Sequence, residues 1–340
     1  MIHIVTGIDE INIENWSLFV YNHPDGNVFQ SPDYYRAINN TNLNKCYSFF
    51  ALEDGEIAGV LVASVMKEEG LFLEAFSSRS IISGGPIVRG NDPLLAKSLI
   101  DCFDSFIRRK VIYSQFRNLF GTDSYKLLFL KNGYTFEDHL NIIINLDINE
   151  DDLWKQVHSK RRNEIRRSKK EGIFVEFVDT RSSVELTYPI LMEVYNRAKL
   201  PLPSIDYFKT ILHELGPGIF RVFAAKSGDT IIGTMYTLCY KNTIYDWYAG
   251  SYAGYYSKYP NDLIPWEVLV WGKKNGYKQF DFGGAGNPNK PYGVRDYKRK
   301  FGGNLVAFGR YEKIFKPTAY KISKAGFSIW KLIRYLGLKC

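Results

Sequence analysis

The strongest constraint on the fold is an order of predicted elements that occurs twice along the chain. Each half has a strand, a glycine-centred tight turn, a second strand, and then a helix and a strand. In the first half these elements are predicted at residues 47–52, 53–55, 57–66, 92–109 and 111–116. In the second half they are predicted at residues 220–226, 227–229, 231–240, 263–275 and 279–282, with a further strand at 244–248. Because no residue-level repeat accompanies this order, it predicts duplication of architecture only.

The length of 340 residues favours two domains, since single hydrophobic cores rarely grow beyond about 250–300 residues. We place the boundary in the acidic polar stretch Asp147–Asp151, between a predicted strand at 141–146 and a predicted helix at 152–171. The sequence therefore predicts an α/β (α+β) protein with mixed sheets. Its predicted parts are residues 1–148, residues 149–316 and a C-terminal helix over residues 317–340.

Positive charge is concentrated in two segments. The formal net charge is +8, yet residues 155–171 hold eight basic side chains against two acidic ones. Residues 313–340 hold seven basic side chains and no acidic one. The rest of the chain is therefore mildly acidic, and a general nucleic-acid coat is not expected.

Cysteine and histidine patterns predict neither disulfides nor a metal site. The cysteines Cys46, Cys102, Cys239 and Cys340 show no Cys-x-x-Cys spacing, and the five histidines are isolated. The first residues show no basic segment followed by an apolar one, and no run reaches 18 apolar residues. These patterns predict a cytoplasmic protein without a membrane span.

Several short sequence motifs in the second half, called words below, are specific enough to suggest a family. They are Ser159–Ser168 (SKRRNEIRRS), Tyr259–Ile264 (YPNDLI), Asp281–Gly284 (DFGG) and Tyr292–Gly302 (YGVRDYKRKFG), with weaker words at Phe29–Tyr34 and Ser83–Pro86. Together they resemble the Fem family, which forms peptidoglycan bridges from aminoacyl-tRNA, and related GNAT-like acyltransferases of polysaccharide clusters. The resemblance implies a tandem of two GNAT-like domains that transfer an acyl group to an amine.

Acyl transfer to an amine passes through a tetrahedral intermediate, so the site needs a group that stabilises an oxyanion and a route for the amine's proton. Lys298 is the candidate for the first task, because it matches the family's aromatic-Lys pair and follows Tyr297 in a predicted loop-to-strand region. The alternative is a solvated lysine. Asp281 is the candidate for orienting or deprotonating the amine, and its alternative role is to cap the backbone of the following loop.

Candidate substrate-binding residues are spread over the chain. Arg36, Arg295 and Tyr297 lie in or near the words that carry the resemblance and are candidates for binding the acceptor. Gly283 and Gly284 permit close backbone approach to a ligand, the alternative being a tight irregular turn. Tyr255 and Tyr256 lie in a dense aromatic stretch that can stack on a sugar or an adenine. The alternative for these aromatic residues is a place in the core or in its edge loop.

Two basic helices are predicted to contact anionic partners. On the first, Arg162, Arg166 and Lys169 form a cationic ridge that suits phosphates of tRNA or of a nucleotide-sugar, the alternative being a solvated helix with ordinary ion pairs. Residues 318–338 form the second, with its lysines and Arg334 on one arc and apolar residues opposite. It predicts peripheral contact with the inner face of an anionic membrane, the alternative being packing of its apolar face on the protein's own core.

The leading hypothesis is transfer of an aminoacyl group from aminoacyl-tRNA to an amine of a cell-envelope or peptidoglycan precursor, with no bound cofactor and no metal. An acyl-CoA-dependent N-acyltransferase acting on an amino sugar in polysaccharide biosynthesis is the first alternative. It is disfavoured because the coenzyme A signature, Gln/Arg-x-x-Gly-x-Gly/Ala at the start of a helix, is not visible. The second alternative is an inactive tandem domain that binds the precursor.

Overall fold

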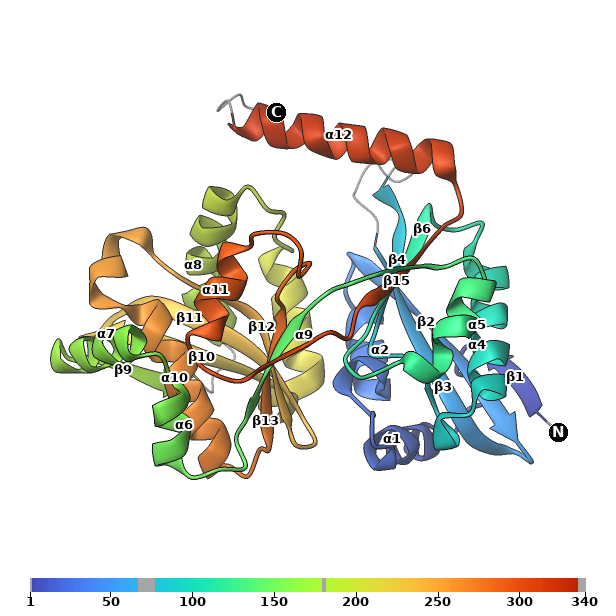
Figure 1. Cartoon of the computed structure of the whole chain (residues 1–340), viewed down its shortest axis with the longest axis horizontal. Coiled ribbons are helices and arrows are strands. Elements are labelled where there is room, and N and C mark those ends of the chain that lie inside the picture. The colour runs from blue at the N-terminus through green and yellow to red at the C-terminus, as the bar shows by residue number, and fades with distance from the viewer. Residues whose placement is uncertain (1, 67–76, 179–181, 336–340) are drawn as a thin grey trace. The chain divides into compact units, whose positions relative to one another are not determined.

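A computed structural model describes residues 2–66, 77–178 and 182–335 and divides the chain into two compact units. The first unit comprises Met1–Asp138 together with Phe308–Cys340, and the second comprises His139–Ala307. Each unit is built on one mixed sheet flanked by helices (Figure 1). The predicted α/β class with two mixed sheets is therefore confirmed.

The sheet of the first unit has the strand order β1-β2-β3-β4-β6-β15-β7, with β5 paired to β3. Its pairs are antiparallel except for the parallel pair β4–β6. The strands are β1 (Ile2–Thr6), β2 (Asn44–Glu53), β3 (Glu56–Met66), β4 (Arg79–Ser83), β5 (Ile87–Val88), β6 (Tyr113–Arg117), β7 (Thr135–Glu137) and β15 (Arg310–Ile314). The hairpin between β2 and β3 turns at Asp54 and Gly55, both of which have positive φ.

Helices cover both faces of this sheet, and two neighbouring residues of β2 show the division. Phe49 contacts Phe103 of α4, whereas Phe50 contacts Trp16 of α1, because successive side chains of a strand point to opposite faces. The helices are α1 (Ile13–Asn22), α2 (Pro32–Asn39), α4 (Pro93–Ile107) and α5 (Lys126–Lys131). α4 begins where the sequence indicates, with Asp92 accepting a hydrogen bond from the Leu94 amide and Pro93 in the first turn.

The sheet of the second unit has the order β14-β8-β13-β12-β11-β10-β9, and only β12 and β13 pair in parallel among its described pairs. The strands are β8 (Asn141–Asn145), β9 (Ile173–Phe177), β10 (Phe220–Ser227), β11 (Thr230–Tyr240), β12 (Thr243–Ser251), β13 (Gln279–Gly284) and β14 (Asn304–Val306). The helices are α6 (Glu150–Gln156), α7 (Ser159–Lys170), α8 (Ser183–Ala198), α9 (Ile205–Ile219), α10 (Pro260–Lys274) and α11 (Gly293–Arg299). Tyr236 of β11 contacts α8 and α9, whereas Phe223 of β10 contacts Trp271 of α10.

The borders of the units differ from the predicted ones because each half of the chain contributes one strand to the sheet of the other unit. β8, predicted as the last strand of residues 1–148, pairs with β13 and β14 in the second sheet. β15, predicted within residues 149–316, pairs with β6 and β7 in the first sheet. The borders therefore lie at 138/139 and 307/308, and α12 is assigned to the first unit with β15.

The basic helix predicted at residues 152–171 is two helices. Val157 and His158 have extended backbone angles, and the His158 amide donates to the Lys300 carbonyl at 2.8 Å. Arg162 closes α6 by donating from Nη1 to the carbonyls of Trp154, Lys155 and Val157 at 3.0–3.4 Å. This tertiary contact with residue 300 overrides the continuous helical pattern of the sequence.

α12 (Pro317–Tyr335) follows β15 and carries most of the predicted C-terminal helix. Residues 336–340 of that prediction lie outside the described residues. Its first turn is attached to the first unit by Tyr320, whose ring packs against Tyr113 and whose hydroxyl donates to Glu312. No helix among the described residues is long and apolar enough to cross a bilayer.

Candidate functional site

The parallel strands β12 and β13 part near the middle of the second sheet. They pair at only three positions, Thr243–Tyr245 with Gln279–Asp281, and β12 then continues to Ser251. A bulge at Trp247 bends β12 at the same level, where Tyr236 and Thr237 of β11 face Tyr248 and Asp246. Parted parallel strands no longer satisfy each other's backbone groups, so this is a place where other polar groups can bind.

Lys298 fills part of this opening. The residue lies on the short helix α11, not in the predicted loop-to-strand region, because residues 293–299 form helical turns before Gly302 and Gly303 redirect the chain. Its half-buried Nζ donates to the Phe282 carbonyl and, at 3.4 Å, to the Gly284 carbonyl, both at the end of β13. An ammonium group has three N–H bonds, so these two acceptors leave one for a ligand.

Two carboxylates interact with the charge of the Lys298 ammonium. Asp281 is buried at 3% exposure, and its Oδ1 accepts from the Gly283 amide at 2.6 Å and from Asn141 Nδ2 at 3.5 Å. Burial raises the pKa of Asp281 to about 6, although the Gly283 amide and the Lys298 charge oppose the shift. Asp281 thus makes the loop-capping contact that was the alternative for this residue, while its catalytic role stays a prediction.

Asp246 is the more accessible of the two. It is half-buried on β12, one residue beyond Tyr245, which pairs with Asp281. Burial raises the pKa of Asp246, and the Lys298 charge partly opposes this. Its carboxylate therefore suits a proton or an ammonium group more than an anion. Sequence reasoning placed Asp246 only within an aromatic stretch and gave it no role.

A buried ion pair anchors the helix that carries Lys298. Arg161 of α7 pairs with Asp262 of α10, and each side chain is only 9% exposed. The Arg161 guanidinium lies 4.8 Å from the ring centre of Tyr297 and 5.1 Å from that of Phe301. The Tyr297 hydroxyl donates to the Asn261 carbonyl. Tyr297, predicted to bind substrate, is therefore tied into this anchor.

The sequence contained a signal for this anchor that residue-by-residue reasoning missed. Arg161 belongs to the word Ser159–Ser168, Asp262 to Tyr259–Ile264, and Tyr297 to Tyr292–Gly302. Three of the four words that carried the resemblance are thus joined by direct contacts, and the fourth, Asp281–Gly284, supplies the carbonyls that hold Lys298.

The remaining predicted residues of the Lys298 region shape its loop. Arg295 donates to the carbonyls of Ala285, Asn287 and Lys290 at 2.6–3.3 Å, and so holds the loop after β13. Gly283 has φ +70°, which favours glycine, whereas Gly284 takes strand geometry opposite Asn141. Their substrate-binding roles stay predictions.

The predicted cationic ridge makes intramolecular contacts. Arg162 caps α6, Arg166 lies over the ring of Trp154 at 5.2 Å, and Lys169 pairs with Glu267 at 2.6 Å. These are the ordinary contacts of a helix surface that were the alternative for this helix, and phosphate binding stays a prediction.

Tyr255, Tyr256 and Arg36, which were also predicted to bind substrate, contact residues other than Lys298 and Asp281. Tyr255 packs partly buried against the core of the second unit, and the exposed Tyr256 accepts a hydrogen bond from Arg197. Arg36 lies on α2 of the first unit, exposed and paired with Asp33 at 3.0 Å. Acceptor binding by these residues stays a prediction.

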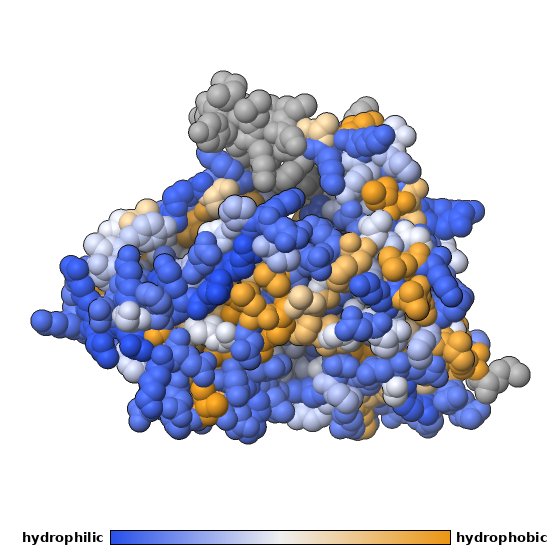
Figure 2. Space-filling view, viewed as in Figure 1, coloured by the Kyte–Doolittle hydropathy of each residue, from blue (hydrophilic) through white to orange (hydrophobic). Residues whose placement is uncertain are grey.

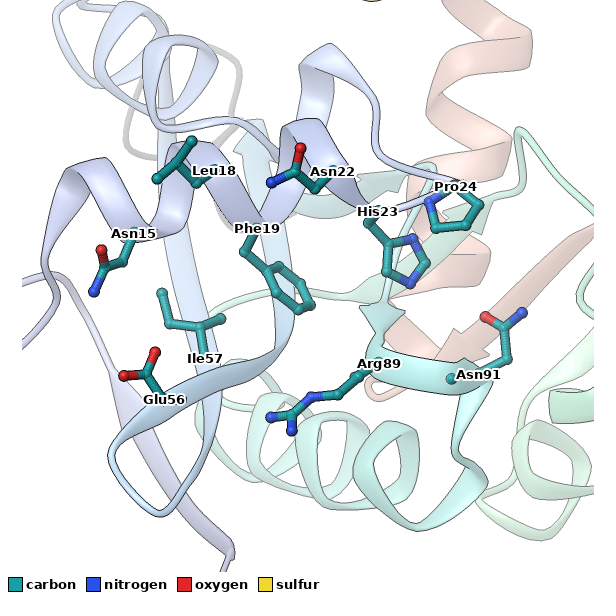
Figure 3. A pocket seen from close by; sticks show the side chains of 11 residues that line it. Asn15, Leu18, Phe19, Asn22, His23, Pro24, Glu56, Ile57, Arg89 and Asn91 are labelled. Atoms are coloured by element: carbon teal, nitrogen blue, oxygen red, sulfur yellow. The ribbon is translucent and has the colours of Figure 1, made fainter.

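A pocket of about 530 Å³ lies in the first unit between α1 and the β2–β3 hairpin (Figure 3). Phe19 occupies the centre of this view, with Ile57 and Arg89 across from it. None of the predicted site residues lines this pocket. Among the residues that the structure describes, no three His, Cys, Asp or Glu side chains are grouped to hold a metal ion.

Comparisons with known proteins define the class. Residues 155–299 match the family model of an acetyltransferase (GNAT) domain, whereas no curated protein matches the chain. Among solved structures, FemX has a TM-score of 0.72 at 16% identity, covering 94% of this chain and 99% of FemX. L-PGS from Bacillus licheniformis has a TM-score of 0.55 at 16% identity, covering 87% and 96%. A tandem GNAT protein from the clavulanic acid biosynthesis pathway has 0.57 at 10%, covering 93% and 99%.

The protein is therefore a tandem of two GNAT-like domains with the fold of FemX. The resemblance to the Fem family is confirmed for the fold, and residues 155–299 of the second unit are similar to an acetyltransferase domain of the GNAT type.

Proposed function

We propose that the protein transfers an aminoacyl group from aminoacyl-tRNA to an amine of a cell-envelope precursor. The observation that carries this proposal is the Lys298 ammonium, held at the parted ends of β12 and β13 with one N–H bond left for a ligand. The similarity of the fold to FemX and to L-PGS from Bacillus licheniformis supports an aminoacyl donor.

The chemistry follows from these groups. The acceptor amine attacks the ester carbonyl, a C–N bond forms, and the C–O bond to the ribose breaks. Lys298 donates a hydrogen bond to the carbonyl oxygen as negative charge develops there. Asp246, whose pKa is raised by burial, takes the proton that the amine loses, and the proton passes to the departing ribose oxygen.

The start of α10 favours an aminoacyl donor over an acyl-CoA. A helix N-terminus attracts phosphates when its amides and positive dipole end are open. In α10 the first turn contains Asp262, whose buried carboxylate is already paired with Arg161. The amides of this turn are also largely used, because Pro260 has no N–H and the Asp262 and Leu263 amides donate to the Tyr259 carbonyl. The start of α10 therefore offers few open groups to a coenzyme A pyrophosphate.

Donor specificity tests the proposal. The protein is incubated with radiolabelled aminoacyl-tRNA or with acetyl-CoA, each with a set of amines that includes lipid-linked and nucleotide-linked muropeptides and amino sugars. We expect amide product from aminoacyl-tRNA and none from acetyl-CoA. Free amino acid with uncharged tRNA serves as the control.

The family model itself favours one other function, an acyl-CoA-dependent N-acyltransferase, because its description is that of an acetyltransferase. Product from acetyl-CoA and an amino sugar, with none from aminoacyl-tRNA, would replace our proposal with this alternative. Precursor binding without turnover of either donor would indicate an inactive binding domain.

A further inference from the structure

The helix α12 exposes an apolar edge that the rest of the first unit leaves uncovered. In its described first turns, the half-buried residues are Ala319, Tyr320 and Ser323. Ile322, 49% exposed, and the exposed Ala325 lie on a different arc, which we call the apolar edge. By helical spacing, this arc is continuous with the apolar side predicted for the whole helix. The alternative that this side packs on the protein's own core is therefore not supported over these turns.

The attachment of α12 uses none of this edge. The Tyr320 ring packs against Tyr113 with centres 5.3 Å apart, and its hydroxyl donates to Glu312. Just before the helix, Lys316 donates to the Arg109 carbonyl at 3.0 Å. α12 is thus fixed at its start, and its apolar edge is open to another partner.

Charge identifies the kind of partner. The exposed Lys321 lies next to the apolar edge, and the exposed Lys324 lies over the Tyr320 ring at 4.5 Å from its centre. Residues 313–340 contain seven basic and no acidic side chains. On the face drawn in Figure 2, hydrophilic residues cover most of the surface, and hydrophobic residues gather mainly near the middle of the view. A helix with one apolar edge next to cations, and too polar to span a bilayer, is typical of helices that lie in the membrane interface.

We infer that α12 docks on the surface of an anionic phospholipid membrane, with Ile322 directed into the acyl boundary and the lysines at the headgroup phosphates. A nucleic acid would engage the lysines but leave Ile322 in water. A second copy of α12 would bring two segments without any acidic residue together, which like-charge repulsion opposes. An anionic membrane satisfies both the charge and the apolar edge, and this inference is independent of the proposed function.

Vesicle sedimentation of the full chain tests the inference. The vesicles are either phosphatidylcholine alone or phosphatidylcholine with one third phosphatidylglycerol, at low and at high salt. We expect binding to the anionic vesicles only, weakened by salt because the Debye length shortens from about 10 Å at 0.1 M to about 3 Å at 1 M. Equal binding to both vesicle types, or to neither, would overturn the inference.

Two variants separate the two contributions. Lys321→Glu with Lys324→Glu is expected to weaken binding at least tenfold, because each cation near an anionic surface contributes on the order of 1 kcal/mol. Ile322→Ser keeps the charge and is expected to weaken binding about threefold to tenfold. The matched control changes the exposed Lys126 and Lys131 of α5 to Glu, which alters net charge equally and leaves binding within twofold.

Each result has one meaning. If the α5 variant weakens binding as much as the α12 variant, net charge explains the binding and the inference fails. If the α12 lysines matter for tRNA retention on a filter but not for vesicles, the partner is nucleic acid. If concentration-dependent dimerisation is lost in Ile322→Ser and vesicle binding is absent, the partner is a second copy.

Discussion

Each unit has its own sheet with one parallel strand pair, and the two sheets differ at that pair. In the first unit, β4 and β6 pair over all five residues of each strand, from Arg79 with Tyr113 to Ser83 with Arg117. In the second unit, β12 and β13 pair at three positions and then part. The same architecture is therefore closed in one unit and open in the other.

The side chains at the two strand ends differ in the same way. In the first unit Gln30, fully buried, donates to the Ser83 carbonyl at 2.9 Å and accepts from the Val62 amide at 2.7 Å, while Asn27 donates to the Gly84 carbonyl at 2.7 Å. In the second unit the carbonyls at the end of β13, the strand that corresponds to β6 in sheet order, meet the Lys298 ammonium. The neutral amide of Gln30 makes its hydrogen bonds to the backbone and so stabilises the fold. The Lys298 ammonium has one further N–H bond that a substrate can accept.

The largest expected effect concerns Lys298. Lys298→Met is expected to lower the rate of acyl transfer about 10²–10³-fold, the usual cost of removing an oxyanion donor, with little change in the free energy of unfolding. Steady-state rates and urea unfolding measure the two quantities. Lys274→Met, at an exposed position of α10, is the matched control. A rate within threefold of that of the unchanged protein would exclude Lys298 from the mechanism. The strand end of the second unit would then have no catalytic group to distinguish it from that of the first.

Gln30 provides the opposite test in the first unit. Gln30→Leu is expected to lower the free energy of unfolding by about 2–4 kcal/mol, because it leaves buried backbone groups of Val62 and Ser83 unpaired. Urea unfolding followed by fluorescence measures this, and Gln279→Leu at an exposed position of β13 is the matched control. A loss no greater than that of the control would show that the closed end does not depend on this amide.

Asp281 gives a pH-dependent effect. Because burial raises its pKa from 3.8 to about 6, the folded protein holds this proton more tightly than the unfolded chain does. The carboxyl therefore imposes no penalty below about pH 4, its ionisation destabilises the fold increasingly between about pH 4 and pH 6, and the penalty is constant at higher pH.

Asp281→Asn is accordingly expected to raise the free energy of unfolding by about 1–3 kcal/mol at pH 8 and by little at pH 4. Urea unfolding at the two pH values gives the difference, and Asp147→Asn, at an exposed carboxyl, is the control. The same change at both pH values would contradict the assignment of the effect to ionisation.

The smallest expected effect distinguishes a structural role of the α7 arginines from a role in phosphate binding. Arg162→Ala should lower the free energy of unfolding by about 1 kcal/mol, because it removes the cap of α6, whereas Arg166→Ala at an exposed position should change it by less than about 0.5 kcal/mol. Thermal unfolding of both variants measures this. Equal effects on stability, with equally weakened tRNA binding, would restore the cationic ridge as a binding surface.

Much of the fold was predictable because its signals are local. The cap at Asp92, the turn at Asp54 and Gly55 and the apolar strands β2, β3 and β11 all lie where the sequence places them. The break between α6 and α7 was not predictable, because it depends on a contact with Lys300, far along the chain. The exchange of β8 and β15 is missed for the same reason, since strand pairing is not encoded in a strand's own pattern.

The candidate site divides in the same manner. The sequence motif around Lys298 predicts its role. Asp246 belongs to no such motif, and its charge interaction with Lys298 depends on the bulge at Trp247 and on the parting of β12 and β13. The weaker words Phe29–Tyr34 and Ser83–Pro86 are explained by the closed end of the first unit. Gln30 reaches the Ser83 carbonyl, and any side chain at Gly85 would collide with Gln30.

The position of β15 has a consequence for synthesis. This strand lies between β6 and β7, so the first sheet has a vacancy in its interior until residues 310–314 have left the ribosome. The second unit, residues 139–307, is complete before that point. The unit that is translated first is thus the one that finishes folding last, and a nascent chain arrested before residue 310 would expose the edges of β6 and β7 to wrong partners.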